Sequence, residues 1–299
     1  MNCPICEHDA SGILLSVKDY TVSNQIFELV KCNSCGFVFT NDPPNEFEIG
    51  KYYQSDAYIS HTNSHEGFFN KIYQSVRKLS IRQKLKLIQQ FSHRHTGSVL
   101  DYGCGTGSFL HYMKDNGWNV TGIEPDPSAQ EKASKLISEK ILPPAALSAL
   151  ESNHFDVVTL WHVLEHVHSL KNVIKELKRV LKKGSILVIA VPNHTSWDAQ
   201  HYKEYWAAYD VPRHLYHFSP MTMHQLLKNA GFEKRVVKPM WFDAFYVSML
   251  SEKYAHGKIN MIRALCYGLV SNIRAFINPF CFQTILPIIA FILPLINNI

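Results

Sequence analysis

Residues 161–168, WHVLEHVH, place His162, Glu165 and His166 in the order H-x-x-E-H. This is the spacing of a zinc peptidase motif, in which two histidines one helical turn apart bind the metal and the glutamate acts as base. The motif requires both histidines to lie in one helix and share a face. Here the apolar run FDVVTL precedes it and is typical of a buried parallel strand. We therefore expect His162 in the loop that follows a strand, which argues against a peptidase.

A glycine-rich segment, VLDYGCGTG at residues 99–107, lies upstream. Glycines between a strand and a helix allow a sharp turn and let the backbone lie close to a ligand. The NAD-binding pattern G-x-G-x-x-G would require a glycine at position 108, where Ser108 stands. Glu124 ends the segment NVTGIE about twenty residues after the turn, where an acid can accept hydrogen bonds from ribose hydroxyls. Together the turn and the acid predict a site for an adenosine-type cofactor.

Strand-like and helix-like segments alternate from Gly97 onward. The expected strands are SVLDYG, NVTGIE, FDVVTLWHV, SILVIAVPN and FEKRVVKP. This alternation predicts an α/β, Rossmann-like, doubly wound and mostly parallel sheet over residues 96–240, with helices on both faces. Since such sheets bind ligands at the carboxyl ends of their strands, WHVLEHV should form a rim of the cofactor pocket. We expect Trp161 to contact the cofactor, and His162 either to face the substrate or only to shape the turn.

Two short cysteine pairs occur within residues 1–50. Cys3 and Cys6 form one C-x-x-C pair, and Cys32 and Cys35 form the other, with strand-like segments between them. Four thiolates at this spacing suit a tetrahedral structural zinc ion, so we expect a small zinc-ribbon module. A disulfide within each pair is the alternative, which a reducing cytosol disfavours.

The remaining segments flank the predicted sheet. Residues 51–95 are expected to form a linker and amphipathic helices with a basic face. Residues 241–299 form an apolar, helical carboxyl-terminal extension whose last part carries no charge. A buried terminal strand and helix, a segment in the membrane interface beside basic residues, and a membrane anchor all fit that last part, although three prolines interrupt it.

The motifs LDYGCGTG, GIEPD, FDVVTLWHVLEHV and ILVIAVPN together resemble the class I S-adenosylmethionine-dependent methyltransferases. The resemblance implies that the methionine end of the cofactor is surrounded by four residues of the turn: Asp101, Gly103, Gly105 and Gly107. It also implies that Glu124 holds the ribose. The family often contacts the adenine through an acid after its third strand, but ILPPAALSAL offers no carboxylate there, so the adenine contact stays unassigned. The Asn-Pro-Pro-Tyr element of amino-group methyltransferases is absent, which favours an oxygen or carbon acceptor.

The segment VPRHLYHFS, within an aromatic stretch at residues 196–220, should cap the pocket. Methyl transfer to a hydroxyl requires an aligned acceptor and the removal of its proton. We predict His214 as the base, with His217 as second choice, and Arg213 as a partner for a substrate anion. A purely structural loop is the alternative. With the cysteine pairs, this segment resembles bacterial methyltransferases that modify cell-surface glycans or lipid-linked sugars, and this resemblance implies a small or lipid-linked acceptor of the cell envelope.

Charge is unevenly distributed along the chain. The formal net charge is +5, yet residues 1–50 carry two basic and seven acidic side chains, a balance of −5, so the rest carries +10. An RNA methyltransferase with a zinc module is the alternative function, but an acidic module disfavours nucleic acid as partner. A non-enzymatic module with a degenerate cofactor fold is a third possibility, which the intact glycine turn disfavours. The polar opening MNCPICEHDA is unlike a secretory signal, so we expect a cytoplasmic protein, with tail contact to the inner face of the membrane as an open alternative.

Overall fold

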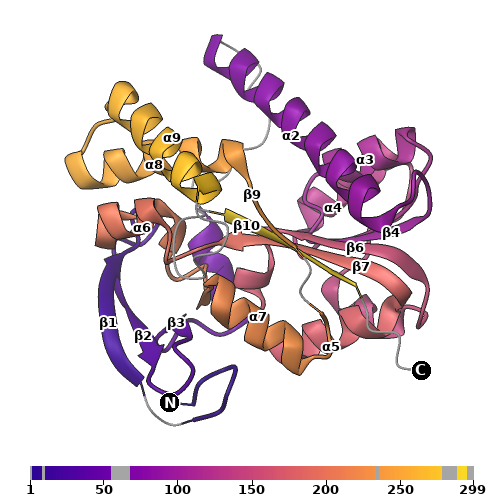
Figure 1. The fold of residues 1–299 in the computed structure, drawn as a ribbon, viewed down its shortest axis with the longest axis horizontal. Helices are drawn as coiled ribbons and strands as arrows, with labels where there is room; N and C mark the ends of the chain where they lie inside the picture. Colours follow the sequence, from indigo (N-terminus) through magenta and orange to yellow (C-terminus); the bar gives the residue numbers. More distant parts are fainter. Residues whose placement is uncertain (1, 9–10, 55–67, 234–235, 278–287, 295–299) are drawn as a thin grey trace.

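The computed structural model describes residues 2–8, 11–54, 68–233, 236–277 and 288–294. The described chain forms two sheets, a large one in the middle of the molecule and a small one beside it (Figure 1).

The large sheet has six strands in the order β5-β4-β6-β7-β10-β9. Its strands are β4 (Ser98–Tyr102), β5 (Asn119–Ile123), β6 (Phe155–Trp161), β7 (Leu181–Pro192), β9 (Val236–Pro239) and β10 (Ile288–Pro294). The first four in the chain pair in parallel. This confirms the predicted α/β, Rossmann-like and mostly parallel fold.

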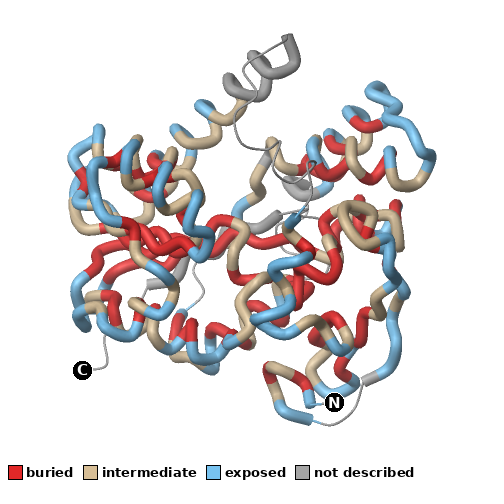
Figure 2. Tube along the Cα trace, turned by 180° about the vertical axis from the view of Figure 1, so that it is seen from behind, coloured by how far each residue is buried: buried red, intermediate tan, exposed pale blue. Residues whose placement is uncertain are grey.

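Helices cover both faces of this sheet (Figure 1). They are α2 (Phe68–Ser92), α3 (Ser108–Asp115), α4 (Pro127–Ile137), α5 (Leu170–Val180) and α7 (Pro220–Asn229). Alternate residues of β6 serve the two layers: Val158 and Leu160 pack with α5 and α7, while Val157 and Trp161 pack with α2, α3 and α4. Every residue of β6 is buried, and Figure 2 shows a continuous buried layer through the middle of the molecule. The carboxyl end of β6 therefore lies under covering helices.

The carboxyl-terminal region contains more than a helical extension. Two helices, α8 (Trp241–His256) and α9 (Met261–Ile277), pack against each other. The strand β10 then inserts between β7 and β9, antiparallel to both. Residues 288–294 thus form a terminal strand, which is one of the alternatives expected for this part of the chain. Among the described residues the helical extension is limited to α8 and α9, and the β-formers of IIAFIL complete the sheet. In the part of the chain that the structure describes, no helix has the length and apolar character needed to cross a bilayer.

The small sheet joins the amino-terminal segment to the aromatic segment. Its four strands, in the order β1-β2-β3-β8, are β1 (Ser11–Lys18), β2 (Ile26–Cys32), β3 (Val38–Thr40) and β8 (Tyr216–His217). All three pairings are antiparallel. Since β8 belongs to the predicted VPRHLYHFS cap, the cysteine-bearing module holds that cap in place.

Candidate functional site

The glycine turn after β4 has the backbone that its sequence predicts. Gly103, Gly105 and Gly107 all have positive φ, which residues with a side chain adopt only with strain. A Cβ on Gly103 would lie 2.3 Å from Val163 Cγ2, so a larger residue would clash with the segment after β6. A Cβ on Gly105 would meet no atom within 4 Å. Gly105 thus borders open space, as a turn that cradles a ligand must.

Two buried carboxylates lie at this turn. Glu124 accepts hydrogen bonds from the backbone N–H of Gly105 at 2.8 Å and of Asp126 at 3.1 Å. A carboxylate has about four acceptor positions, so both oxygens keep capacity for ribose hydroxyls. Asp101 accepts a hydrogen bond of 2.6 Å from Thr159 Oγ1. Burial raises the pKa of Asp101 to about 7, although Thr159 and the Lys84 ammonium oppose this shift. The turn therefore offers two buried carboxyl groups whose ionised forms a cationic ligand would favour.

The helix α2 brings two cations to the turn that sequence reasoning did not single out. Arg77 donates to Ser108 Oγ at 2.6 Å. About two turns further along the helix, Lys84 Nζ lies 4.2 Å from the ring centroid of Trp161. The sequence could have indicated this pair, because residues seven positions apart in an amphipathic helix lie on one helical face.

A shallow hollow opens beside Trp161, between α2, the end of β6 and the start of α8. Its lining is Ser80, Gln83, Lys84, Leu87, Trp161, Pro239, Met240, Phe242 and Asp243. Five of these nine side chains are apolar, and the other four are a hydroxyl, an amide, a cation and a carboxylate. Such a mixture suits a molecule with an apolar body and few polar groups.

The H-x-x-E-H motif is split as the sequence predicts. His162 lies directly after β6 with φ of +60°, and His166 ends the short 3-10 helix η3 (Leu164–His166). His162 Nε2 lies 3.4 Å from Asp243 and its Nδ1 lies 3.7 Å from Glu165. Burial lowers the pKa of His162, but these two carboxylates outweigh it and raise that pKa to about 9. His162 is therefore a cation at neutral pH and holds two carboxylates together.

His166 and His214 meet edge to face, with ring centroids 4.6 Å apart. His166 Nδ1 lies 3.0 Å from the carbonyl of Arg213 and 3.0 Å from the Tyr53 hydroxyl, and His214 Nδ1 lies 2.9 Å from the carbonyl of Ala208. Because a carbonyl only accepts, each Nδ1 carries the proton and each Nε2 keeps a lone pair. Glu165 Oε1 lies 4.0 Å from His214 Nε2. The three side chains form a compact cluster, which is called the His-His-Glu cluster below.

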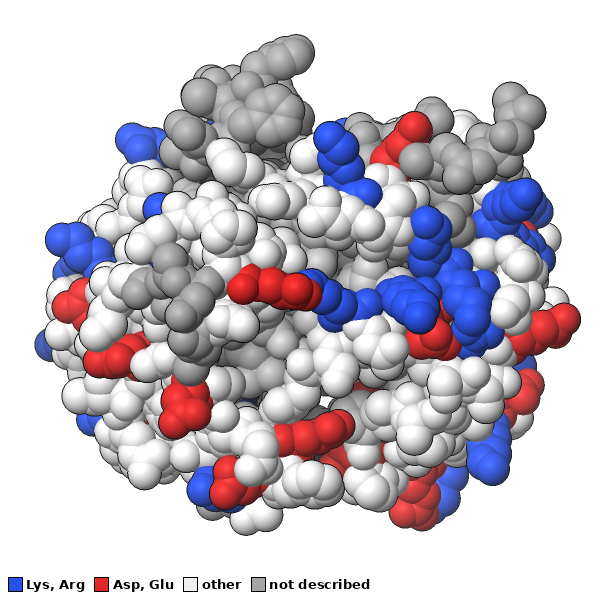
Figure 3. All heavy atoms as spheres, turned by 90° about the horizontal axis from the view of Figure 1, so that it is seen from below, with Lys and Arg blue, Asp and Glu red and all other residues white. Residues whose placement is uncertain are grey.

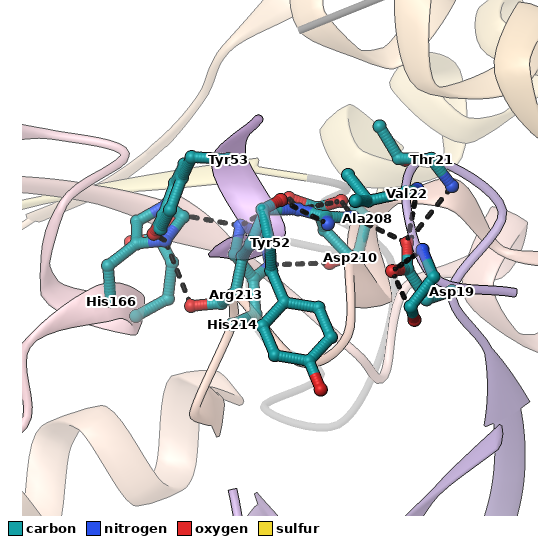
Figure 4. Close-up of polar contacts among 12 residues, drawn as sticks. Asp19, Thr21, Val22, Tyr52, Tyr53, His166, Ala208, Asp210, Arg213 and His214 are labelled. Atoms are coloured by element: carbon teal, nitrogen blue, oxygen red, sulfur yellow. Dashed lines mark hydrogen bonds and ion pairs between the residues drawn. The ribbon is translucent and has the colours of Figure 1, made fainter. Parts of the chain in front are cut away.

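Figure 4 shows that the other predicted residues of this loop have structural partners. The Arg213 guanidinium is fully buried between Asp210 at 2.6 Å and Asp19 at 3.1 Å, and it donates to the carbonyl of Tyr52 at 2.9 Å. The prediction that Arg213 holds a substrate anion is therefore wrong, since two carboxylates already neutralise it. His217 lies 3.1 Å from Thr40 Oγ1, which itself donates to the carbonyl of His214. His217 thus joins β8 to β3 and lies outside the His-His-Glu cluster.

The four amino-terminal cysteines converge. Cys3 and Cys35 Sγ atoms lie 3.5 Å apart, as do those of Cys6 and Cys32. All four sulfur atoms lie within 4.8 Å of one another, and none forms a disulfide. A tetrahedral ion at about 2.3 Å from each sulfur would hold them a little under 4 Å apart, so the geometry fits a metal centre.

Comparison with known proteins places these features in context. A family model described as a methyltransferase domain matches residues 73–237, more than half of the chain. A malonyl-[acyl-carrier protein] O-methyltransferase of Enterobacter lignolyticus is 28% identical over 148 residues, covering 49% of this chain and 58% of the relative. A ubiquinone biosynthesis O-methyltransferase of Idiomarina loihiensis is 27% identical over 181 residues, covering 52% of this chain and 69% of the relative.

An uncharacterized protein of Methanocaldococcus jannaschii is 34% identical over 110 residues, covering 37% of this chain. The chain spans about half the length of the first of these curated relatives, 47% and 58%. Among solved structures, the 1,6-didemethyltoxoflavin-N1-methyltransferase of Burkholderia thailandensis, bound to S-adenosylhomocysteine, has a TM-score of 0.50 at 15% identity. It covers 89% of this chain and 98% of its own. At this identity the likeness concerns the fold.

Proposed function

The chain belongs to the methyltransferase domain family and is an S-adenosylmethionine-dependent methyltransferase; from this premise we propose that it methylates an oxygen or carbon atom of a small or lipid-linked, sugar-type molecule of the cell envelope. The hollow beside Trp161 carries the proposal, because it offers a partly apolar space at the carboxyl end of β6, where such sheets bind their ligands. The relatives named as O-methyltransferases support an oxygen acceptor.

The cofactor would lie against the glycine turn. Glu124 would accept hydrogen bonds from the ribose, and the open space at Gly105 would let the backbone approach the ligand. Asp101 would face the positively charged methionine end, and Arg77 stands at the same turn for its carboxylate. S-adenosylmethionine supplies an electrophilic methyl group when bound, while these residues hold and orient it. Trp161 borders the hollow, and its ring also packs edge to face on Phe109 of α3, the helix that follows the turn.

Replacement of Glu124 tests this assignment. In Glu124→Ala we expect affinity for S-adenosylmethionine to fall at least about 100-fold, because both the ribose contact and the bond to the Gly105 N–H are lost. Glu124→Gln keeps an acceptor for one of the two bonds and should lose less. Calorimetric titration of the purified protein measures both affinities. An unchanged affinity in Glu124→Ala would mean that the ribose lies elsewhere.

The acceptor is best identified by a transfer assay. We expect a labelled methyl group from S-adenosylmethionine to enter the lipid-linked or small-molecule fraction of cell-envelope extracts. Label in RNA alone would favour the alternative, an RNA methyltransferase. On the face shown in Figure 3, Lys and Arg gather on one side while Asp and Glu lie among them and across the rest. That face therefore lacks the continuous basic surface that a nucleic-acid reader presents.

The cysteine cluster would hold a structural zinc ion. Four sulfur atoms within 4.8 Å of one another supply a complete tetrahedral set, so no position is left for a reacting molecule. The bound ion would fix the loops that precede β1 and follow β2. Because β3 pairs with β8, the zinc ion would also support the segment that carries His214.

We further propose that α9 contacts the surface of an anionic membrane. Its outward residues Ile262, Leu265, Leu269 and Ile273 recur every three or four positions, and Ile262 is 77% exposed. Residues 257–277 contain Lys258, Arg263 and Arg274 and no acid. An apolar stripe flanked only by basic groups matches a lipid surface with negative headgroups. Since α9 packs on α8, which borders the hollow, this contact would favour a lipid-linked acceptor.

A double substitution on α9 tests this contact. In Leu265→Asp with Leu269→Asp, binding to vesicles that contain anionic phospholipid should fall at least about 10-fold, since apolar area is lost and repulsive charge is added. Sedimentation with vesicles measures the bound fraction. Leu136 of α4 is exposed to a similar degree, so Leu136→Asp is the matched control and should bind as the unaltered protein does. Equal loss in both variants would contradict the proposal.

A further inference from the structure

The Glu165 side chain at the centre of the His-His-Glu cluster is fully buried, with 0% of its surface exposed. Among the residues that the structure describes, neither of its carboxylate oxygens has a hydrogen-bond partner. A carboxylate that is buried without such partners is strongly destabilising, because its desolvation is not compensated. The nearest cations are His162 Nδ1 at 3.7 Å and, when protonated, His214 Nε2 at 4.0 Å, both beyond hydrogen-bond length. The carboxylate is thus aimed at a position that a cation would fill.

The two histidines are oriented as metal ligands are. Each gives its Nδ1 proton to a backbone carbonyl, His166 to Arg213 and His214 to Ala208. Histidines that bind metals usually donate the other ring N–H in this way, which fixes the ring and directs the free nitrogen at the ion. Here each ring keeps an unprotonated Nε2, and that of His214 lies 4.0 Å from Glu165 Oε1. One ligand atom from each of Glu165, His166 and His214 lies within 4.8 Å of the others.

We propose that Glu165, His166 and His214 bind a divalent transition-metal ion at a site separate from the cysteine cluster. Ligand atoms at about 2.0 to 2.2 Å from an ion lie about 3 to 4 Å apart, so only a small closure is required. Two imidazoles and one carboxylate favour ions such as Fe²⁺, Co²⁺ or Zn²⁺ over Ca²⁺. Asp210 Oδ2, 3.9 Å from His214 Nε2, adds a second negative charge beside the site.

This site differs from the peptidase pattern that the H-x-x-E-H spacing suggests. In that pattern His162 and His166 would bind the ion together. In this structure His162 turns to Asp243 and Glu165, and His214 from a distant segment takes its place. Three protein ligands leave coordination positions open. An oxygen of the methyl acceptor could occupy one of these positions, and that role rests on the proposed function. Binding of the ion itself does not depend on the proposed function.

Metal titration of the full-length, zinc-loaded protein tests the site without cofactor or acceptor. Co²⁺ is the probe, because it binds more weakly than zinc to a given site and should leave the cysteine cluster occupied. We expect calorimetry, with metal content by mass spectrometry, to show one further ion. In Glu165→Gln, His166→Asn and His214→Asn the affinity for this ion should fall more than about 10-fold. Asn retains a donor near the Nδ1 position but has no atom at Nε2, so the loop contacts are kept.

His162→Gln is the matched control, since it alters a neighbour of Glu165 that is not a ligand. Its Co²⁺ affinity should equal or exceed that of the unaltered protein, because a competing cation is removed. No further ion in the unaltered protein, equal affinity in Glu165→Gln, or a loss in His162→Gln as large as in His214→Asn would each overturn the proposal. The unfolding temperature of every variant is measured as well. A value within a few degrees of that of the unaltered protein shows that the variant is folded, so that a lost affinity reflects loss of the metal ligand. A failed methyl-transfer assay would leave these binding results unchanged.

Discussion

Cys32→Ala is expected to unfold the amino-terminal module and to abolish methyl transfer, while leaving affinity for S-adenosylmethionine within a few-fold of its original value. Cys32 is 1% exposed at the end of β2, and its sulfur lies 3.5 Å from Cys6. Zinc binding to such a cluster is itself folding free energy, so we expect a loss of at least about 4 kcal/mol for the module. Zinc content and thermal unfolding, with and without a chelator, measure the effect.

The loss should reach the candidate site because the module carries the His214 segment. Thr40 of β3 donates to the carbonyl of His214 at 2.7 Å, and its N–H donates to the carbonyl of Leu215 at 3.0 Å. Asp19, which belongs to the same module, forms a buried ion pair with Arg213 of the His214 segment. When β3 is released, the ring of His214 loses the backbone that positions it. The turn after β4 is held by pairing of β4 with β5 and by the bond from the Gly105 N–H to Glu124, so we expect cofactor affinity to change much less than methyl transfer.

Cys266→Ser provides the matched control, since Cys266 is exposed on α9 and lies outside the cluster. It should keep both the zinc content and the unfolding temperature. Retention of a full zinc equivalent by Cys32→Ala, or loss of zinc only when His162 is replaced, would exclude the cysteine cluster as the zinc site.

The sequence was sufficient for the parallel sheet and for its cofactor turn. Buried strands such as β6 are continuous apolar runs, and a glycine turn between a strand and a helix is a local pattern. The strand exit at His162 followed from the same local logic. The cysteine pairs also predicted their own convergence, because their spacing requires only a short hairpin between them.

Contacts between distant segments could not be predicted in this way. His166 and His214 are far apart in the chain, and their meeting depends on β8 joining β3. Arg213 looked like an anion-binding residue because nothing in its local sequence reveals the buried Asp19. A terminal strand was one of three alternatives for the last segment, and the prolines there left the choice open. In the structure Pro294 falls at the last position of β10. The position of Asp243 against His162 likewise requires the return of α8 to the sheet.

Asp101→Asn is expected to stabilise the free protein at neutral pH and to abolish cofactor binding. Burial raises the pKa of Asp101 to about 7 in the folded protein, whereas an unfolded aspartate has a pKa of about 3.9. Between about pH 4 and pH 7 the folded state therefore holds a proton that the unfolded state has lost, so the free energy of unfolding falls as pH rises through this window. Above pH 7 the loss is complete, and Asn avoids it. We expect a gain on the order of 2 to 4 kcal/mol at pH 8 and little difference near pH 4.

Cofactor binding should show the opposite preference. The methionine end of S-adenosylmethionine is cationic, so the affinity of the unaltered protein should rise between pH 6 and pH 8 as Asp101 ionises. In Asp101→Asn the affinity should fall at least about 100-fold and lose this dependence, although Asn Oδ1 can still accept the hydrogen bond from Thr159.

Asp156, near the amino end of β6, is the control residue. Burial would raise its pKa, but hydrogen bonds from Ser98 and Lys182 outweigh this and lower it. Asp156→Asn should therefore lose stability at neutral pH, and that loss should vanish as pH falls through the lowered pKa. The contrary outcome is an effect of Asp101→Asn on the free energy of unfolding that is the same at pH 8 as at pH 5. Asp101 would then already be ionised in the free protein at pH 5, and its buried charge would need another partner.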